Sequence, residues 1–403
     1  MDMDGSGFGK LVHAYRQQRG WTQEDLAERW GFTREYVSQI ERGKRKLDRQ
    51  EQVSRLADIL GIPDERLAAI GKKNQLTTSA RRPLENDNAL LQALLEPVQN
   101  TIKMSWLIWR GDGMIIDVAA SLRDLERRLT DVLGLYHGEF HISALRILGS
   151  THEMLGQLAI ERTATKEAVF HFQEMYDIAD ELGDADMLAL AMIHQAEMLR
   201  RRGWYETSFR RLHTVEKHVQ EAPEKYMQHV SSWIQGVLWK AYAITSFVNN
   251  DEGRFVRAVD HAEEIAQDTV STLDTLCHEF DQVEILQVKA QGYTQLWQPE
   301  KALDIYKKTD GLRAFRPIRD QCSYAIIKAQ AHCYVGDLPQ GIKYAHEGLE
   351  MAESIGSLRY VTRLRQMSDR LSVTQIGKQR AMQKLQKDIQ GTFQRMSQRE
   401  ESV

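Results

Sequence analysis

The stretch at residues 20–43 constrains the fold of this chain more than any other, because it encodes two short helices separated by a tight turn. Thr22 is a favourable N-cap, and Asp25, three residues later, completes a capping-box pattern. Gly31 supplies the backbone freedom that the turn requires. Thr33 is suited to cap the second helix, and the glycine at position 43 is suited to end it.

The side chains of this stretch separate into an apolar face and a polar face. Leu26 and Ala27 of the first helix and Val37 and Ile40 of the second are expected to face inward. The remaining face of the second helix carries Arg and Gln side chains. This geometry is the one needed to lay one helix in the major groove of duplex DNA.

Residues 8–70 resemble the lambda repressor/Cro-type helix-turn-helix domain, commonly called the XRE family. The matching residues are Leu11, Arg16, Thr22, Gln23, Leu26, Ala27, Gly31, Val37, Ser38, Ile40, Glu41 and Gly43, followed by an amphipathic helix at residues 56–60. The resemblance implies a five-helix DNA-binding domain in which Gln23 grips a phosphate and Arg16 forms a structural pair with Glu41. An ordinary helical bundle that does not bind DNA is the alternative.

The candidate DNA-binding residues lie on and just after the second helix. The resemblance assigns base contacts to Arg34, Glu35, Ser38 and Gln39. Basic residues follow directly at Arg42, Lys44, Arg45, Lys46 and Arg49, where phosphate contacts would supply affinity that is independent of sequence. The complete candidate set is Gln23, Thr33, Arg34, Glu35, Tyr36, Ser38, Gln39, Arg42, Lys44 and Arg45.

Charge is distributed unevenly along the chain. Residues 1–82 carry 16 Lys and Arg against 12 Asp and Glu, a net charge of +4, whereas the remaining residues carry 37 against 45, a net charge of −8. A positive N-terminal segment suits contact with phosphate. A solvated linker surface is the alternative for the basic residues that follow residue 71.

Length and composition predict a second, larger helical domain. A chain of 403 residues exceeds one small DNA-binding unit, and only seven prolines interrupt it. The three cysteines form no CxxC pair, which suits a reducing compartment. No apolar run approaches the roughly 18 residues of a membrane helix, and the acidic, glycine-rich start resembles no signal or transit peptide. We therefore expect a cytoplasmic protein.

Four segments are expected along the chain. Residues 1–70 form the helix-turn-helix domain, and the polar residues 71–86 form a linker that includes a helix-disfavouring proline. Residues 87–373 form a helical repeat domain. Residues 374–403 form an amphipathic helix whose apolar stripe, Met382 to Met396, either caps the repeats or joins a partner chain.

A weak internal repeat runs through the helical region. Short breaks recur at Thr163, Gly203, Gly253, Trp297 and Gly336. Small residues stand five positions after them, at Ala168, Ser208, Ala258, Ala302 and Gly341, and seven positions before them, at Gly156, Ala196, Ser246, Ala290 and Ala329. Small residues at fixed offsets allow two helices to pack closely, and these offsets resemble those of tetratricopeptide repeats. The sequence therefore predicts an all-α fold, with an α-solenoid of TPR-like helical hairpins after the head domain.

Two features of the repeat leave alternatives open. The breaks lie 40, 50, 44 and 39 residues apart, whereas the standard repeat is about 34 residues, so an irregular superhelix is expected. A further helical hairpin is expected around residues 111–113, between residues 106–110 and 114–133. A β-hairpin is the competing prediction there, and a helical protein without true repeats is the alternative for the whole region.

No catalytic motif is found. His152–Glu153 and His278–Glu279 lack the second histidine of a metallopeptidase helix, and no phosphate-binding, nucleophile-elbow or dinucleotide motif occurs. We expect no enzyme activity, no cofactor and no metal site.

A helical-repeat domain offers a concave wall lined by the first helix of each pair. Carrying the repeat register along the chain gives the candidate ligand-groove residues Glu153, Gln157, Glu197, Arg200, Arg201, Lys240, Asn250, Gln287, Gln291 and Gln330. Amide side chains suit the binding of a peptide backbone because each is both donor and acceptor. Solvated surface is the alternative for any one of them.

The combination of this head with a TPR-like body resembles the RRNPP group of bacterial quorum-sensing regulators, which bind secreted signalling peptides. The resemblance implies a homodimeric transcription regulator that binds a palindromic operator in double-stranded DNA and senses a small peptide or protein tail. The alternatives are a scaffold whose body docks a protein partner and a repressor without an effector.

Overall fold

The computed structural model describes residues 5–19, 21–30, 32–43, 45, 47, 53, 56–57, 59–62, 85–111, 115–133, 139–221, 229–268 and 280–401. The chain divides into two compact units, Met1–Asp87 and Asn88–Val403, here called the head and the body. Every regular element in these ranges is a helix, so the predicted all-α fold is confirmed for them. None of the described helices is long and apolar enough to cross a membrane.

The head is built on α1 (Gly5–Gln18), α2 (Gln23–Trp30) and α3 (Arg34–Glu41). The predicted capping box is present, since the Thr22 amide donates to Asp25 Oδ2 at 2.7 Å and the Asp25 amide donates to Thr22 Oγ1 at 3.1 Å. Thr33 caps α3 by accepting from the Tyr36 amide at 3.2 Å. The core contains Phe8, Val12, Leu26, Ala27, Trp30, Tyr36, Val37, Ile40, Leu47, Val53, Leu56, Ala57, Leu60 and Ile62.

Helices α1 and α3 meet at Gly9 with almost no space between their backbones. A Cβ atom on Gly9 would lie 2.0 Å from the Ile40 carbonyl oxygen, so no larger residue fits there without a shift of backbone.

Of the predicted linker, residues 71–84 lie outside the described part of the chain, and its last two residues already belong to α6, which begins at Glu85.

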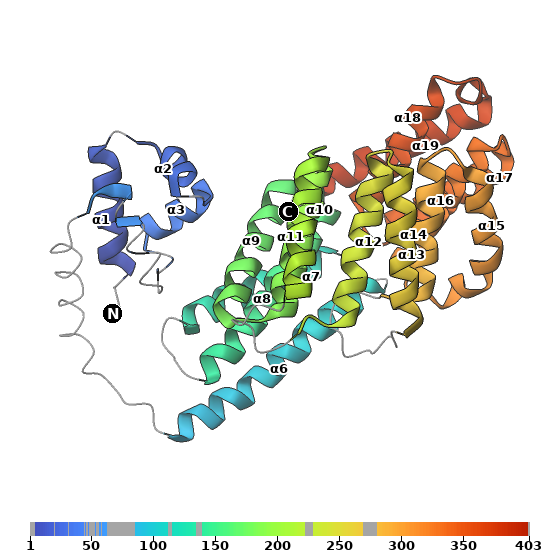
Figure 1. Ribbon diagram of the computed structural model, residues 1–403. Coiled ribbons are helices and arrows are strands. Elements are labelled where there is room, and N and C mark those ends of the chain that lie inside the picture. The colour runs from blue at the N-terminus through green and yellow to red at the C-terminus, as the bar shows by residue number, and fades with distance from the viewer. Residues whose placement is uncertain are drawn as a thin grey trace. The chain divides into compact units, whose positions relative to one another are not determined.

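The body is a series of helical hairpins followed by capping helices (Figure 1). Its elements are α6 (Glu85–Arg110), α7 (Ile115–Leu133), α8 (Glu139–Glu161), α9 (Thr165–Leu182), α10 (Ala185–Arg201), α11 (Tyr205–Glu221), α12 (Ser232–Val248), α13 (Glu252–Asp268), α14 (Gln282–Gln295), α15 (Pro299–Thr309), the 3₁₀ turn η1 (Asp310–Phe315), α16 (Ile318–Tyr334), α17 (Leu338–Ser354), α18 (Leu358–Ser372), η2 (Ile376–Lys378) and α19 (Arg380–Glu401). The β-hairpin alternative at residues 106–133 is wrong, because the described residues there form the end of α6 and the whole of α7.

One kind of turn recurs between the two helices of each hairpin. The turn residue has a positive φ at Thr163 (62°), Gly203 (79°), Asn250 (59°), Trp297 (60°) and Gly336 (85°). In each case the next amide reaches back to a carbonyl five residues earlier, as from Ala164 to Ala159 at 2.8 Å and from Asp337 to His332 at 2.9 Å. This bonding is the Schellman pattern, which ends a helix by satisfying its last carbonyl groups.

The predicted break at Gly253 is wrong. Gly253 lies inside α13, and Asn250 is the residue that occupies the left-handed turn. Asparagine tolerates this conformation better than most residues, so it substitutes for glycine there. With this correction the turn residues are 40, 47, 47 and 39 positions apart, and the residue seven before the third turn becomes Ala243, which is fully buried.

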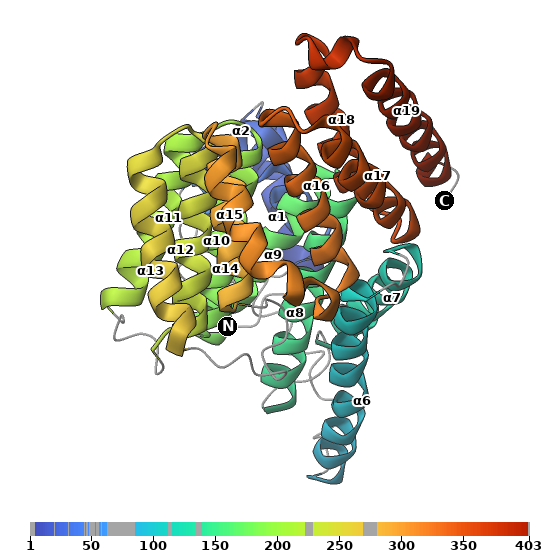
Figure 2. The same cartoon turned by 90° about the vertical axis from the view of Figure 1, so that its right-hand side faces the viewer.

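The apolar stripe of α19 is covered by the protein's own chain. Met382, Leu385 and Ile389 are buried in one cluster with residues of α17 and α18, and Figure 2 shows these three helices side by side. The packing is that expected of a capping helix, and the choice between capping and dimerisation stays a prediction. The buried residues of this stripe are not available as a dimer surface.

The body closes on itself through the Glu161 carboxylate at the end of α8. Arg319 of α16 donates to Glu161 Oε2 at 3.3 Å, and Arg359 of α18 donates to Oε1 at 3.2 Å. Ser357 also donates to this carboxylate. The Glu161 and Arg319 side chains are only 1% and 4% exposed, so this cluster joins the first and last hairpins inside the protein.

The positive-φ turns predict opposite effects for two substitutions. Thr163→Gly is expected to raise the free energy of unfolding by roughly 0.5 kcal/mol, because relief of about 1–2 kcal/mol of strain exceeds glycine's entropic cost of about 0.5–1 kcal/mol. Gly203→Ala is expected to lower it by about 1 kcal/mol, since a Cβ there has free space and only the backbone is strained. Urea denaturation measures both. Changes of the same sign in the two variants would contradict the assignment of Thr163 and Gly203 to left-handed turns.

The Glu161 cluster predicts a large loss of stability for Glu161→Gln. The substitution leaves the buried Arg319 and the partly exposed Arg359 without their carboxylate, which is expected to cost about 3–5 kcal/mol. Glu353→Gln is the matched control, because Glu353 pairs with Arg395 at the surface, where both side chains are more than a third exposed. An exposed pair contributes about 1 kcal/mol or less. Equal losses in calorimetric unfolding would show that Glu161 does not hold the body closed.

Candidate functional site

The first candidate site is the exposed side of α3 in the head. Arg34 and Arg42 are exposed, and Gln39 and Arg45 are partly exposed. The Arg45 guanidinium lies 4.6 Å from the centre of the Tyr36 ring. These four side chains give α3 and the residues after it cationic and amide groups of the kind that suit contact with phosphates and base edges.

Other predicted DNA-binding residues have structural partners in the head. Tyr36 is only 5% exposed and stacks on Phe32 in the core, so packing accounts for it. Ser38 is buried, and its Oγ accepts from Arg42 Nε at 3.1 Å. Thr33 is exposed but acts as the cap of α3. The Glu35 side chain and Lys44 lie outside the described residues.

The predicted Arg16–Glu41 pair is present and forms the centre of a buried network. Arg16 Nη2 donates to Glu41 Oε2 at 2.9 Å, and Arg16 Nη1 donates to the Trp21 carbonyl at 2.6 Å. Gln23 Nε2 donates to the same carboxylate at 2.8 Å, so the side chain expected to grip a phosphate is held by Glu41. Burial raises the pKa of Glu41, but hydrogen bonds from Arg16, Gln23 and His13 outweigh burial and lower it.

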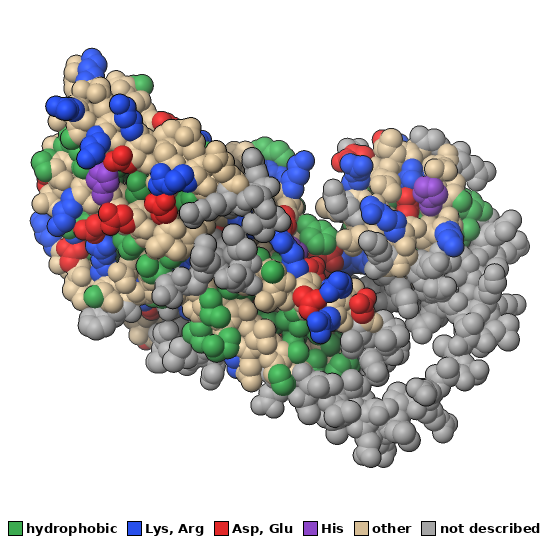
Figure 3. All heavy atoms as spheres, turned by 180° about the vertical axis from the view of Figure 1, so that it is seen from behind, with side chains coloured by type: hydrophobic (Ala, Val, Ile, Leu, Met, Phe, Trp, Pro, Cys, Tyr) green, Lys and Arg blue, Asp and Glu red, His purple; other side chains and the backbone are tan. Residues whose placement is uncertain are grey.

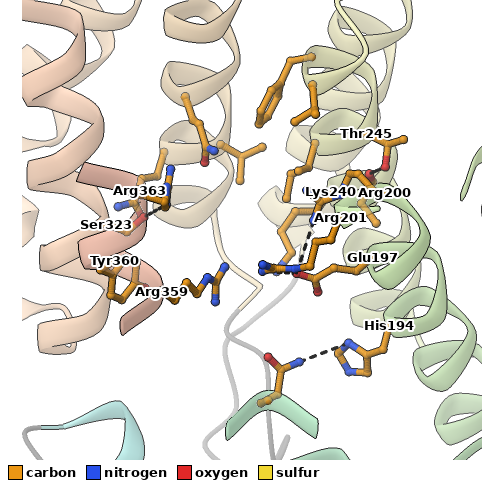
Figure 4. Close-up of a pocket in the computed structure, with 18 of the residues that line it drawn as sticks. His194, Glu197, Arg200, Arg201, Lys240, Thr245, Ser323, Arg359, Tyr360 and Arg363 are labelled. Carbon is orange, nitrogen blue, oxygen red and sulfur yellow. Dashed lines mark hydrogen bonds and ion pairs between the residues drawn. The ribbon is translucent and has the colours of Figure 1, made fainter. Parts of the chain in front are cut away.

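The second candidate site is a cavity of about 680 Å³ in the body. The first helix of each hairpin supplies most of its wall, in the order α8, α10, α12, α14 and α16, and α18 completes it. In Figure 4, Arg359 of α18 extends across the cavity toward Glu197 and Arg201 of α10. The cavity is therefore enclosed by segments that begin and end the body, brought together at Glu161.

The structure brings together eight of the ten predicted groove residues. Those that line the cavity are Gln157, Glu197, Arg200, Arg201, Lys240, Asn250, Gln287 and Gln291. The other two are buried in packing between helices. Glu153 lies 3.4 Å from His194 Nε2, and Gln330 donates to the Tyr334 hydroxyl at 2.7 Å. Gln330 also accepts from Gln295 of α14 at 3.2 Å, and neither Glu153 nor Gln330 lines the cavity, because the rotation of each helix turns these side chains into the packing.

Sequence reasoning missed the α16 and α18 side of the cavity. Arg319, Arg359, Arg363 and Arg370 line it, together with Tyr360. The recurring turn at Gly336 ended the repeat that the sequence revealed, so α18 was not assigned to the wall. The arginine spacing along α18 was a usable signal, because positions 359, 363 and 370 lie on one face of a helix.

The cavity wall carries an excess of positive charge. Eight Lys and Arg residues line it, against four Asp and Glu residues. Glu197 is bound by Arg201 at 2.8 Å, and Lys240 pairs with Glu284 at 2.9 Å. By contrast, the face of the body seen in Figure 3 shows acidic and basic side chains intermingled. A cationic wall around a partly open cavity favours a ligand that brings negative charge.

Burial changes the titration of the cationic wall. Burial lowers the pKa of Arg200 to about 10, although Glu197 acts in the opposite direction. Burial also lowers the pKa of Arg363, as does the positive charge of Arg359. Arg363 Nη1 donates to Ser323 Oγ at 3.2 Å. Both pKa values are lowered, as expected where positive charges are crowded and partly removed from water. A bound anion would therefore be stabilised there.

Comparison with known proteins identifies the head. Residues 8–70 match the family model described as a helix-turn-helix domain. No curated protein matches the chain. Among solved structures, the chain is similar to the crystal structure of Bacillus thuringiensis PlcR in complex with the peptide PapR7 and DNA, at 13% identity and a TM-score of 0.38, over 83% of this chain and 99% of that chain. At this TM-score the structural similarity assigns no function to the chain. The head is therefore identified by the family match at residues 8–70 alone. The head contains a helix-turn-helix domain.

Proposed function

We propose that this chain is a cytoplasmic, sequence-specific DNA-binding transcription regulator, rather than an enzyme, whose body senses a small anionic peptide. The observation that carries the proposal is the pairing of a helix-turn-helix domain with a partly open cationic cavity in the same chain. The head supplies recognition of duplex DNA. The body supplies a site at which a ligand changes the regulator's state.

The DNA-binding part rests on the exposed face of α3. Arg34 and Gln39 are at the start and middle of this helix, where side chains of a recognition helix reach base edges. Arg42 is placed for phosphate contact at its end. A single head reads only a few base pairs, so we propose a homodimer that places two heads about one helical turn apart on a palindromic operator.

The ligand part rests on the size and chemistry of the cavity. Its volume of about 680 Å³ falls within the range of about 300–1,000 Å³ for small-ligand sites. That size suits a short peptide and disfavours the surface of a folded partner. Amide side chains such as Gln157 and Gln291 offer both donors and acceptors to a peptide backbone. The arginines of α18 favour carboxylate groups on the ligand.

The mechanism follows from the contacts of Glu161 with α16 and α18, which close the row of helices from α8 to α18 into a ring. A ligand that contacts α10, α14 and α18 at once stabilises one spacing of these helices over others. It alters DNA binding only if its affinity differs between the two arrangements of the dimer. We propose that ligand binding adjusts the ring and thereby the distance between the two heads.

The DNA-binding proposal predicts a loss of specificity on substitution of the reading helix. With an operator selected from random duplexes by the full chain, Arg34→Ala and Gln39→Ala are each expected to weaken operator binding by about 1–3 kcal/mol. Affinity for unrelated DNA is expected to change little. Lys10→Ala, on exposed α1, is the control for loss of a surface charge. Equal losses on both DNAs, measured by fluorescence anisotropy, would assign these residues to phosphate contact.

The ligand proposal predicts that two α18 arginines are required for the response to peptide. The effector is sought by mass spectrometry of peptides that copurify with the full chain from its native host. Arg363→Gln with Arg370→Gln is expected to reduce affinity for that peptide by more than about tenfold, since two charge-assisted contacts are lost. Operator binding without peptide is expected to persist.

The matched control is Arg127→Gln with Arg128→Gln, which removes the same two charges from the exposed surface of α7. This variant is expected to bind the peptide as the unaltered chain does. Equal losses in both double variants would show a general charge effect and contradict a specific cationic site. A chain that copurifies with no peptide and regulates its operator fully would support a repressor without an effector.

A further inference from the structure

Two histidines and one glutamate converge at the N-terminal end of the body, away from the residues that line the cavity. Glu126 comes from α7, His152 from α8 and His171 from α9, and each offers one ligand atom. These three atoms all lie within 4.8 Å of one another. The two imidazole Nδ1 atoms are 3.0 Å apart, and His152 Nδ1 is 3.7 Å from Glu126 Oε1.

These distances are close to those of a tetrahedral metal site. Ligand atoms at about 2.0–2.1 Å from Zn²⁺ lie roughly 3.3–3.4 Å from each other when the angles are tetrahedral. The distance between the two Nδ1 atoms is a few tenths of an ångström shorter than this value, and the distance from His152 Nδ1 to Glu126 Oε1 is a few tenths longer. We propose that Glu126, His152 and His171 form a binding site for a divalent transition-metal ion, with Zn²⁺ as its best-suited occupant.

The chemistry of the three ligands supports this choice. Imidazole nitrogen with carboxylate oxygen is a donor set that suits Zn²⁺ and related ions, and three protein ligands leave a fourth position for water. His152 and His171 are only 3% and 4% exposed.

The surroundings of the site provide access and favourable charge. The Glu126 side chain is 24% exposed, so an ion can reach the cluster from this side. The negative charges of Glu174 and Glu167 act on Glu126. The nearby cations Arg123 and Arg162 are bound to Glu167, at 3.1 and 2.8 Å. A bound cation would offset the crowding of carboxylates around Glu126.

A metal at this site would tie three helices together. Helix α7 packs on α8, and α8 packs on α9, but the Glu126 and His171 side chains belong to helices that are not consecutive. Coordination would therefore fasten α7 to the first hairpin of the body. The expectation of no metal site rested on the absence of a second histidine within one helix. It did not address ligands that come from three helices.

The test uses the full chain stripped with EDTA, freed of the chelator and titrated with Zn²⁺ alone. We expect one Zn²⁺ per chain by equilibrium dialysis and elemental analysis, with a rise in Tm on binding. Glu126→Gln and His171→Asn are expected to weaken Zn²⁺ binding by more than about tenfold, at least as much as loss of an outer-shell partner. His332→Asn is the control, because His332 also lies beside a carboxylate, 3.1 Å from Asp337.

Glu126→Gln decides the outcome if His171→Asn fails to fold, since it keeps the shape of a partly exposed side chain. Circular dichroism in EDTA verifies the fold of each variant. Co²⁺ in place of Zn²⁺ should give visible absorption bands of a four-coordinate site in the unaltered chain and in His332→Asn, but not in Glu126→Gln. The proposal is overturned if the unaltered chain binds no Zn²⁺, or if Glu126→Gln binds Zn²⁺ as tightly as the unaltered chain.

Discussion

The body depends on one buried carboxylate that holds its two ends together. Glu161, at the end of α8, accepts hydrogen bonds from Arg319, Ser357 and Arg359, which follow it by about 160–200 residues. A stack of hairpins without such a contact would present an open groove. Because an unpaired charge is costly away from water, the cluster is favourable only when all of its members are in place. The contacts that join α8 to α16 and α18 are therefore also the contacts that bring the walls of the cavity together.

Closure also determines the chemistry of the cavity. Closure brings the arginines of α18 opposite Glu197 and Arg201 of α10. Positive charge then exceeds negative charge in a space partly screened from solvent. Interactions between a ligand and such a wall are stronger than at an open surface, since water screens them less. The same geometry couples the helices, because a ligand that touches α10 and α18 acts on elements that are far apart in the sequence.

The head uses the same device on a smaller scale. The buried Arg16–Glu41 pair joins α1 to the end of α3, and Gly9 lets the two helices approach until their backbones touch. Gln23 joins α2 to the same carboxylate. The orientation of the reading helix is thus set by contacts on its buried side. Arg34 and Arg42, the proposed DNA contacts, are exposed. In both units a buried carboxylate holds together the helices that carry the candidate functional surface.

The sequence by itself determined the features that depend on neighbouring residues. The capping box at Thr22, the turns at Thr163 and Gly336, and the small residues before each turn were readable because helix caps and close helix pairs involve residues only a few positions apart. The tertiary structure alone decided the covering of the α19 stripe, the meeting of the α18 arginines with α10 and the convergence of Glu126 with two histidines. These depend on the rotation of each helix and on contacts between distant segments, which no local pattern records.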